Sequence, residues 1–173
     1  MSEINIYCDG ACSGNPGKGG WAAIIVRGNK ELIISGNNPY TTNNQMELTA
    51  VISALEMLKK EEVATVYSDS KYVVNGITDW VKKWKEKKWV SSSGTRVANQ
   101  DLWIKLDQLV SELHPKIIWM KGHSSYYIDM ADKYAKDQTR DLKKGMMLPY
   151  VKWISREKPI VSLMAISFEN LPD

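Results

Sequence analysis

The sequence predicts a single α/β domain in which three antiparallel strands precede a helix and a parallel strand. Two features of the apolar pattern support this prediction. Near the N-terminus apolar and polar residues alternate, which is typical of half-buried strands. From Asn44 to about Lys60 the apolar residues instead recur at helical spacing, with no proline or glycine among them. A helix that leads from one strand of a sheet into another implies a parallel crossover.

The antiparallel strands are expected at residues 3–9, 21–26 and 31–34, the last two joined as a hairpin. Residues 10–20 hold five glycines and one proline, and this composition predicts a loop. The remaining elements follow from the same signals. They are strands at 63–67 and 116–121, a short helix at 71–77 broken by Gly76, a basic amphipathic segment at 78–88, a Ser/Gly loop at 90–97, and helices at 99–113 and 129–140.

Length and composition limit the possible classes of protein. The chain has 173 residues, of which 43% are hydrophobic and 25% charged, values typical of a globular protein with one core. The longest uncharged apolar stretch, 160–168, is shorter than a membrane helix, and the N-terminus lacks a basic signal-peptide start. Cys8 and Cys12 are the two cysteines, which fits a reducing compartment. We therefore expect a soluble, cytoplasmic protein.

The formal net charge is only +3, but the positive charge is concentrated in one segment. Six basic residues and one acid lie between Trp80 and Arg96, and Trp80, Trp84 and Trp89 interleave with the lysines. Point charges beside stacking faces suit nucleic acid. A solvated helix face whose tryptophans pack inward explains the segment equally well, so both interpretations stay open.

Several carboxylates stand where packing alone does not explain them. Asp9 and Asp69 each end a predicted strand, and ligands gather at such strand ends in open α/β sheets. Glu47 shares a helical stripe with Val51, so a charge begins the face that should enter the core. A capping contact between Glu47 and Asn44 would also explain this position.

These acids are more informative together than singly. If Asp9, Glu47, Asp69 and an acid of the last helix converge, up to four negative charges share one pocket, a repulsion that divalent cations would neutralise. Ligand sets made only of oxygen favour Mg²⁺ or Mn²⁺ over zinc. Two such ions about 4 Å apart can activate a water and stabilise the leaving oxygen of a phosphodiester. The pattern therefore predicts phosphoryl transfer to water.

Two other constellations fit less well. Residues 12–19 have the outline of a phosphate-binding P-loop but miss two of its four fixed positions. The cysteines and histidines do not have the spacing of a zinc site. These residues are Cys8, Cys12, His114 and His123.

Six motifs follow one another along the chain: Tyr7–Gly17, Thr41–Leu48, Tyr67–Val73, Asn99–Trp103, Lys121–His123 and Ala131–Ala135. In order and spacing they resemble the type 1 ribonucleases H, the ribonuclease HI family. The likeness extends from residue 3 to about residue 140. It implies the family fold, a five-stranded mixed sheet of order 3-2-1-4-5 with helices on both faces, which agrees with the elements expected above.

The resemblance implies an endoribonuclease that hydrolyses the RNA strand of RNA–DNA hybrids and leaves 5′-phosphate and 3′-hydroxyl ends. It also implies two Mg²⁺ ions, for which Mn²⁺ can substitute, held by Asp9, Glu47, Asp69 and Asp132. His123 corresponds to the loop histidine of the family, which we expect to assist proton movement or product departure. The implied partner is an RNA–DNA hybrid, and we expect a monomer that does not bind membranes.

The resemblance further assigns contacts to the substrate. Asn43 and Asn44 stand where the family contacts RNA 2′-hydroxyls, and Gly10 stands where the backbone approaches the same strand. The segment from Trp80 to Trp89 corresponds to the basic protrusion that holds the DNA strand. The substrate-binding residues expected on this basis are Gly10, Asn15, Thr42, Asn43, Asn44, Trp80, Lys82, Lys83, Lys85, Lys87, Lys88 and Asn99.

Tyr40 departs from the family pattern, because many members have an arginine seven positions before the helix glutamate. The pocket for a DNA phosphate therefore keeps Thr42 and Asn99 but loses a charge, and we expect a weaker grip on the DNA strand. The last helix departs as well. Asp129 follows Ile128 where the family usually has Asn-Glu, so Asp129 stays an alternative to Asp132 as the fourth ligand.

The C-terminal tail has no counterpart in the family. We expect a catalytic domain at 1–143 and an extension of unknown role at 144–173, either packed on the sheet as a strand or helix or docked on a partner. Two other functions stay open. One is a catalytically idle nucleic-acid-binding module, against which the four carboxylates argue, and the other is a nuclease of the same fold that accepts double-stranded RNA.

Overall fold

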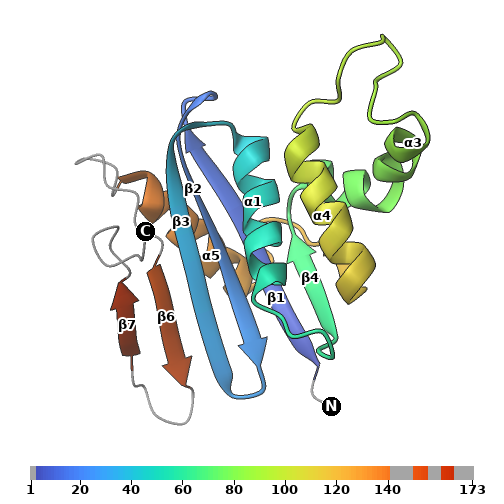
Figure 1. The fold of residues 1–173 in the computed structure, drawn as a ribbon. Helices are drawn as coiled ribbons and strands as arrows, with labels where there is room; N and C mark the ends of the chain where they lie inside the picture. The colour runs from blue at the N-terminus through green and yellow to red at the C-terminus, as the bar shows by residue number, and fades with distance from the viewer. Residues whose placement is uncertain (1–2, 141–149, 156–160, 166–173) are drawn as a thin grey trace, which may run out of the picture.

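A single twisted sheet runs through the computed structural model, which describes residues 3–140, 150–155 and 161–165 (Figure 1). Its strand order is β5-β4-β1-β2-β3-β6-β7. The strands are β1 (Ile4–Ser13), β2 (Gly17–Arg27), β3 (Lys30–Thr41), β4 (Ala64–Ser68), β5 (Lys116–Trp119), β6 (Tyr150–Ser155) and β7 (Val161–Ala165).

The first five strands confirm the predicted order 3-2-1-4-5. β1, β2 and β3 are antiparallel neighbours, while β4 runs parallel to β1 and β5 parallel to β4. Beyond the predicted sheet, β6 pairs antiparallel with β3, with Ser155 opposite Lys30 and Tyr150 opposite Ser35. β7 then pairs antiparallel with β6. The described part of the C-terminal extension therefore continues the same sheet at its β3 edge.

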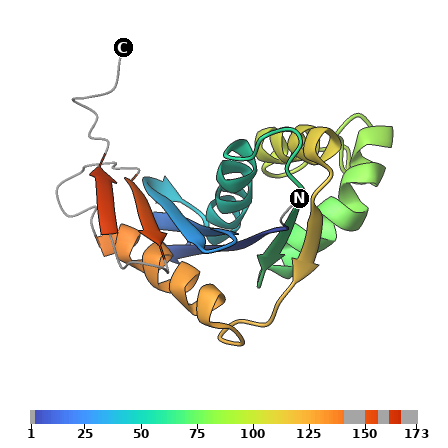
Figure 2. The same ribbon diagram turned by 90° about the horizontal axis from the view of Figure 1, so that it is seen from below.

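Helices cover both faces of the sheet, as predicted. α1 (Asn43–Glu56) and α4 (Gln100–Leu113) lie on one face, and α5 (Tyr126–Arg140) lies on the other (Figure 2). A continuous helical segment made of α2 (Lys71–Asn75), the π-helical turn η1 (Gly76–Trp80) and α3 (Val81–Glu86) projects beside α4. Within the described ranges no helix combines the length and the apolar character needed to cross a bilayer.

The main core fills the space between the sheet and the α1–α4 layer. Ile6 and Val66 from neighbouring strands pack there with Leu48 and Val51 from α1 and with Trp103 from α4, all fully buried. A smaller cluster under α5 contains Ile24, Ile33 and Ala131. Successive residues of β2 and β3 thus face two apolar layers, with Ile25 and Leu32 in the main core and Ile24 and Ile33 under α5.

The expected loop at residues 10–20 is wrong, because β1 continues to Ser13 and β2 begins at Gly17. Only the turn between the strands uses a glycine for its conformation, namely Gly14 with φ +84°. Gly19 and Gly20 instead lie within the paired strand, where neighbours leave no room for a side chain. A Cβ at Gly20 would lie 2.2 Å from the carbonyl oxygen of Ala135 on α5. Here glycine indicates close packing within a strand and not a loop.

The expectation that Gly76 breaks the helix beginning near Lys71 is also wrong. The helical segment continues through Gly76, with φ −60° there, as far as Glu86. A Cβ at Gly76 would lie 2.0 Å from the indole ring of the fully buried Trp103. The glycine is therefore required by the contact with Trp103.

We predict that Gly20→Ala destabilises the protein more than Gly28→Ala does. At Gly20 the new methyl group meets the backbone of α5, so the helix must shift, at a cost of about 3 kcal/mol in the free energy of unfolding. At Gly28, where φ is +56° and the surrounding space is open, the backbone conformation alone costs about 1 kcal/mol. Urea denaturation measures both values. Equal losses would show that α5 does not pack tightly on β2.

Candidate metal centre and nucleic-acid interface

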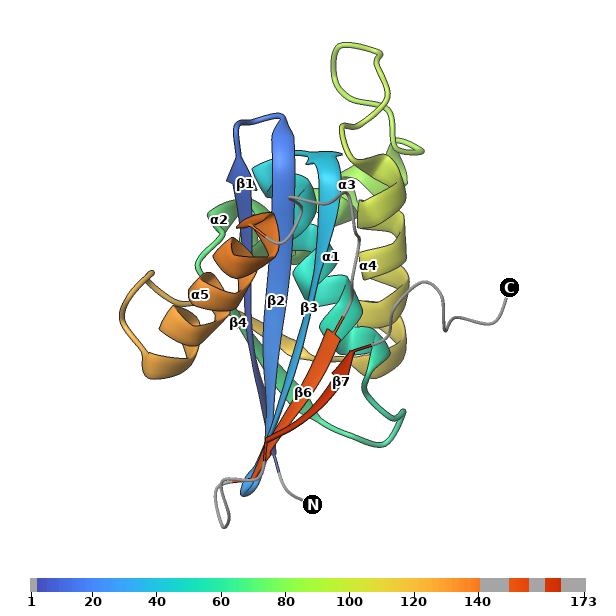
Figure 3. The same cartoon turned by 90° about the vertical axis from the view of Figure 1, so that its left-hand side faces the viewer.

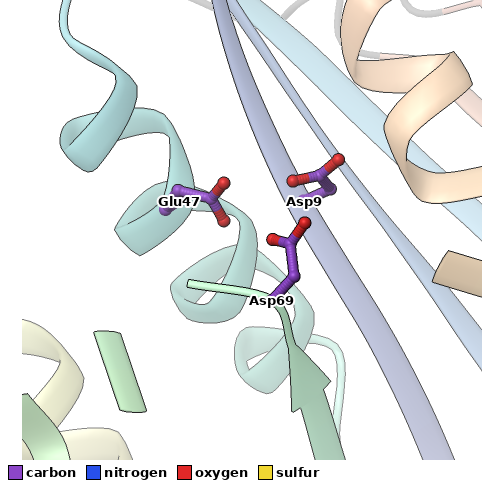
Figure 4. A group of neighbouring side chains, drawn as sticks. All are labelled: Asp9, Glu47 and Asp69. Atoms are coloured by element: carbon purple, nitrogen blue, oxygen red, sulfur yellow. The ribbon is translucent and has the colours of Figure 1, made fainter. Parts of the chain in front are cut away.

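Three carboxylates converge near the middle of the sheet (Figure 4). Asp9 lies on β1 and Asp69 directly follows β4, and the parallel register that pairs Cys8 with Ser68 places these two acids side by side. Glu47 reaches the same place from α1. One oxygen from each of the three carboxylates lies within 4.8 Å of the others. The arrangement offers an all-oxygen ligand set, which is the kind that hard divalent cations prefer.

Gly10 allows the helix to come this close to the strand. A Cβ at Gly10 would lie 2.5 Å from the backbone nitrogen of Glu47, so α1 packs directly on the backbone of β1. The backbone N–H of Gly10 also donates to Oδ1 of Asp9 at 2.9 Å. Gly10, expected to admit the substrate strand, here admits the helix that carries Glu47.

The capping alternative for Glu47 is wrong. The N-cap of α1 is Thr42, whose Oγ1 accepts from the backbone N–H of Gln45 at 3.2 Å. Glu47 is only 4% exposed, and its Oε2 has no hydrogen-bond partner among the described residues. A buried carboxylate oxygen without a partner is costly unless a cation or a proton meets it. The residues present therefore fit a bound cation.

The electrostatics of the cluster point the same way. Burial, reinforced by Glu47 and Asp69, raises the pKa of Asp9 to about 11. Burial also raises the pKa of Glu47 to about 8 and the pKa of Asp69 above its usual value. At neutral pH the metal-free cluster therefore holds protons that a divalent cation would displace.

A fourth acid, Asp132 on α5, completes the lining of the cleft. Although partial burial opposes ionisation, hydrogen bonds from Lys136 and with Asp9 outweigh it and lower the pKa of Asp132. The Lys136 ammonium lies 2.8 Å from Oδ2 of Asp132. Asp129, the alternative, forms no part of this lining and instead accepts from His123. The geometry favours Asp132 as the fourth acid.

His123 lies in the loop before α5, with φ +60° and a largely exposed ring. Its Nδ1 is 2.8 Å from Oδ1 of Asp129. When protonated, its ring favours the ionised forms of Asp69 and Asp132, so it stands within electrostatic reach of the cleft. His123 is therefore placed beside the carboxylates but does not belong to the three that converge.

The carboxylates line an open cleft of ≈ 450 Å³. Besides the acids, the lining includes Gly10 and Asn43, two residues that the sequence analysis expects to contact the substrate. Sequence reasoning missed Lys136, although its position one helical turn after Asp132 is a recognisable signal for an ion pair. The full lining consists of Asp9, Gly10, Ala11, Cys12, Asn43, Glu47, Asp69, Ser70, Asp132 and Lys136.

The expected substrate residues near the start of α1 also come together. Oδ1 of Asn15, in the β1–β2 turn, accepts from the backbone N–H of Asn43 at 3.1 Å, which ties that turn to the helix. Asn43 and Asn44 are both exposed at the first turn of α1. Thr42 acts as the N-cap, so its hydroxyl has a structural partner as well.

Asn99 lies apart from the cleft, in a second hollow of ≈ 340 Å³ at the start of α4. Its amide donates to the hydroxyl of Tyr72 and accepts from Gln45. Arg96 also lines this hollow, an arginine that the resemblance to the family did not single out. Tyr40, by contrast, is 72% exposed and lies outside the lining.

The basic protrusion, residues 80–89, has features of both interpretations left open above: its tryptophans pack inward, and its lysines are available to bind nucleic acid. All five lysines are exposed, whereas Trp80, Trp84 and Trp89 are partly buried, and the ring of Trp84 packs at a tilt against the rings of the other two. Lys83 and Lys85 form ion pairs with Asp79 and Asp107. No ion pair within the described part of the chain involves the remaining lysines, which are Lys82, Lys87 and Lys88. The tryptophans support the segment, and these lysines carry its free charge.

Comparison with known proteins agrees with the geometry. A sequence model of the RNase H family matches residues 1–140. The ribonuclease H of Acetivibrio thermocellus is 49% identical over 148 residues, which cover 83% of this chain and 99% of the relative.

Solved structures share the fold at lower sequence identity. LC9-RNase H1, a type 1 RNase H with the type 2 active-site motif, superposes with a TM-score of 0.73 at 22% identity and covers 96% of this chain and 78% of its own. LC11-RNase H1 in complex with an RNA/DNA hybrid superposes with a TM-score of 0.60 at 22% identity, over 80% of this chain and 97% of its own. From the family match, the close relatives and the shared fold together, this chain belongs to the ribonuclease H family.

Proposed function

We propose that this ribonuclease H hydrolyses the RNA strand of RNA–DNA hybrids with two divalent cations, Mg²⁺ in preference, and leaves 5′-phosphate and 3′-hydroxyl ends. One observation carries the proposal: Asp9, Glu47 and Asp69 converge in an open cleft, and a buried oxygen of Glu47 has no partner among the described residues. Paired divalent cations would supply an activated water and charge neutralisation at the scissile phosphodiester.

Each residue of the cleft then has a distinct task. The three converging carboxylates, Asp9, Glu47 and Asp69, bind the cations, and Asp132 is the fourth ligand. Lys136 holds the Asp132 carboxylate ionised and in one orientation through their 2.8 Å contact.

His123 is suited to move a proton beside the cleft. With Asp129 accepting from Nδ1–H, the other ring nitrogen, Nε2, is left to accept a proton. We assign His123 to proton transfer or product departure and not to metal binding, because it lies outside the cleft lining, to which Asp132 belongs, and contacts Asp129 instead.

A hybrid substrate fits the surface around the cleft. The related LC11-RNase H1 has been solved in complex with an RNA/DNA hybrid. Asn43 and Asn44 are exposed polar groups at the wall or rim of the cleft, suited to RNA 2′-hydroxyls, while the basic protrusion offers cations to the DNA backbone. We further propose that residues 1–143 form the catalytic domain, that 144–173 is an appended extension, and that the protein acts as a monomer.

We predict that the wild-type protein cleaves only the RNA of a hybrid, with Mg²⁺ and not with EDTA, when RNA is presented in hybrid, duplex and single-stranded form. Asp9→Asn and Asp69→Asn should each reduce cleavage to below a few per cent, because each removes a ligand. Binding of the hybrid should survive or improve, since the repulsion among the carboxylates falls. Gel assays measure cleavage, and fluorescence anisotropy measures binding.

Asp137→Asn is the matched control for this experiment. It makes the same change of charge on α5, at a residue that contacts Arg140 and lies outside the cleft lining, and activity should stay at the wild-type level. Substantial cleavage by Asp9→Asn would contradict the metal assignment. Equal cleavage of duplex RNA would replace hybrid specificity by the broader nuclease alternative, and binding without cleavage by the wild type would leave an idle binding module.

We predict that replacing Lys82, Lys87 and Lys88 together by alanine raises KM roughly 10-fold and leaves kcat near the wild-type value, because lysines that hold phosphates position the substrate without taking part in chemistry. In a plot of the logarithm of the binding constant against the logarithm of the salt concentration, the slope should become less steep by about 0.9 for each phosphate that the protein no longer neutralises. Kinetic titrations at several salt concentrations provide both quantities.

The control removes the same charge elsewhere. Lys30, Lys60 and Lys116 are exposed and far along the chain from the protrusion, and their triple replacement by alanine should leave the salt slope unchanged. If both triple variants change the slope equally, net charge and not the protrusion governs binding.

A further inference from the structure

The buried face of α5 carries one amide side chain among residues that are otherwise apolar. The face of α5 that packs on the sheet consists of Ile128, Ala131, Ala135 and Gln138. Gln138 is only 1% exposed, although glutamine is mostly found on protein surfaces. An apolar side chain of equal length could fill the same space. An amide forms hydrogen bonds in defined directions and can therefore fix the orientation of a helix, which apolar contacts do not do.

The amide of Gln138 is held by two hydrogen bonds of opposite sense. Its Nε2 donates to Oγ of Ser35 at 3.0 Å, and its Oε1 accepts from Nδ2 of Asn37 at 2.8 Å. Ser35 and Asn37 are two residues apart on β3, so they share the face that α5 covers. Movement of α5 along β3 by one residue pair would break both bonds at once.

Close to Gln138, the contact between α5 and the sheet is made by small residues. Ala131 and Ala135 are small, and Gly20 lies under the backbone of α5, so this part of the helix approaches the sheet closely. A second polar contact stands near the other end of the helix, where the hydroxyl of Tyr127 donates to Oε1 of Glu31 at 2.6 Å. These two polar contacts of α5 reach β3, whereas Asp132 on the same helix contacts Asp9 on β1, and β2 lies between these two strands (Figure 3).

This network is not the most stable way to fill the space. Oδ1 of Asn37 is buried and has no hydrogen-bond partner among the described residues. An incompletely satisfied polar network stabilises a protein less than well-packed apolar residues would. What the network provides is a unique position for α5 on the sheet.

The position of α5 matters because the helix carries Asp132. Gln138 follows Asp132 by six residues, roughly 9 Å along the helix axis and on a different side of it. Asp132 contributes to the cleft that Asp9 lines, while Gln138 is bonded beneath β3. A shift of α5 that breaks the Gln138 contacts would therefore displace Asp132 relative to Asp9.

We propose that Gln138 is a positioning residue, whose hydrogen bonds to Ser35 and Asn37 hold α5 in the register that brings Asp132 to the metal centre. The proposal deepens the proposed function and rests on its assignment of Asp132 as a metal ligand. It concerns the affinity of the centre for a cation as well as catalysis.

The test compares the full-length wild type with Gln138→Met, which keeps the length of the side chain and removes both hydrogen bonds. Mn²⁺ affinity, measured by calorimetry without substrate, should fall roughly 10-fold, and kcat should fall by a similar factor while KM changes little. Ser35→Ala removes only one of the two bonds and should lower Mn²⁺ affinity in the same direction by a smaller factor, which keeps the test available if Gln138→Met does not fold.

Ile33→Val is the matched control for a purely structural effect. Ile33 is fully buried in the cluster under α5, so its truncation loosens the packing of the same helix and leaves the hydrogen bonds intact. The melting temperature should fall, but Mn²⁺ affinity and kcat should stay at wild-type values. A loss of Mn²⁺ affinity as large as that of Gln138→Met would overturn the proposal.

A double-mutant cycle with Asp132→Asn identifies the route of the effect. With Asp132 already changed, Gln138→Met should lower Mn²⁺ affinity no further. The same loss in both backgrounds would show that Gln138 does not act through Asp132 and would overturn the proposal. If Asp132→Asn alone leaves the affinity unchanged, the fourth-ligand assignment of the proposed function fails instead, and the positioning role through Asp132 fails with it.

Discussion

The burial and mutual repulsion of carboxylates at the base of an open cleft form the constraint on which the rest of this structure depends. Asp9 and Glu47 are almost fully buried, and no described side chain meets the Oε2 atom of Glu47. Burial, reinforced by Glu47 and Asp69, raises the pKa of Asp9 to about 11, so the cluster holds protons when no cation is bound. The fold keeps these acids together at a cost in stability, which is typical of a site shaped for a ligand that is itself positively charged.

Close approach of backbones makes this convergence possible. The parallel pairing of Cys8 with Ser68 sets Asp9 beside Asp69, and the missing side chain of Gly10 lets α1 bring Glu47 against β1. On the opposite face Gly20 lets α5 lie equally close to β2. Small residues therefore stand where acids from different elements must meet, and larger apolar residues fill the core farther away.

Periodicity predicted the strands and helices because it reports burial, and strand ends marked Asp9 and Asp69 as candidate ligands. The strand order and the convergence of the acids were implied by the resemblance to the ribonuclease HI family. The sequence misjudged residues 10–20 and Gly76, since glycine composition cannot distinguish a loop from a strand or helix whose neighbour occupies the side-chain space. It also left Asp129 open beside Asp132. Three residues of helix place both acids on nearly the same side, and only the tertiary position of α5 separates them.

The most direct test of this account is the number of protons released when the metal-free protein binds Mn²⁺. Calorimetry in buffers of different ionisation enthalpy measures that number. At pH 7 the protein should release about one to two protons, because the pKa values of Asp9 and Glu47, about 11 and about 8, lie above that pH. The number should fall above pH 8 as Glu47 ionises before the metal binds, and Asp9→Asn should release about one proton fewer. Identical heats in every buffer at pH 7 would show that no proton leaves and would contradict the account.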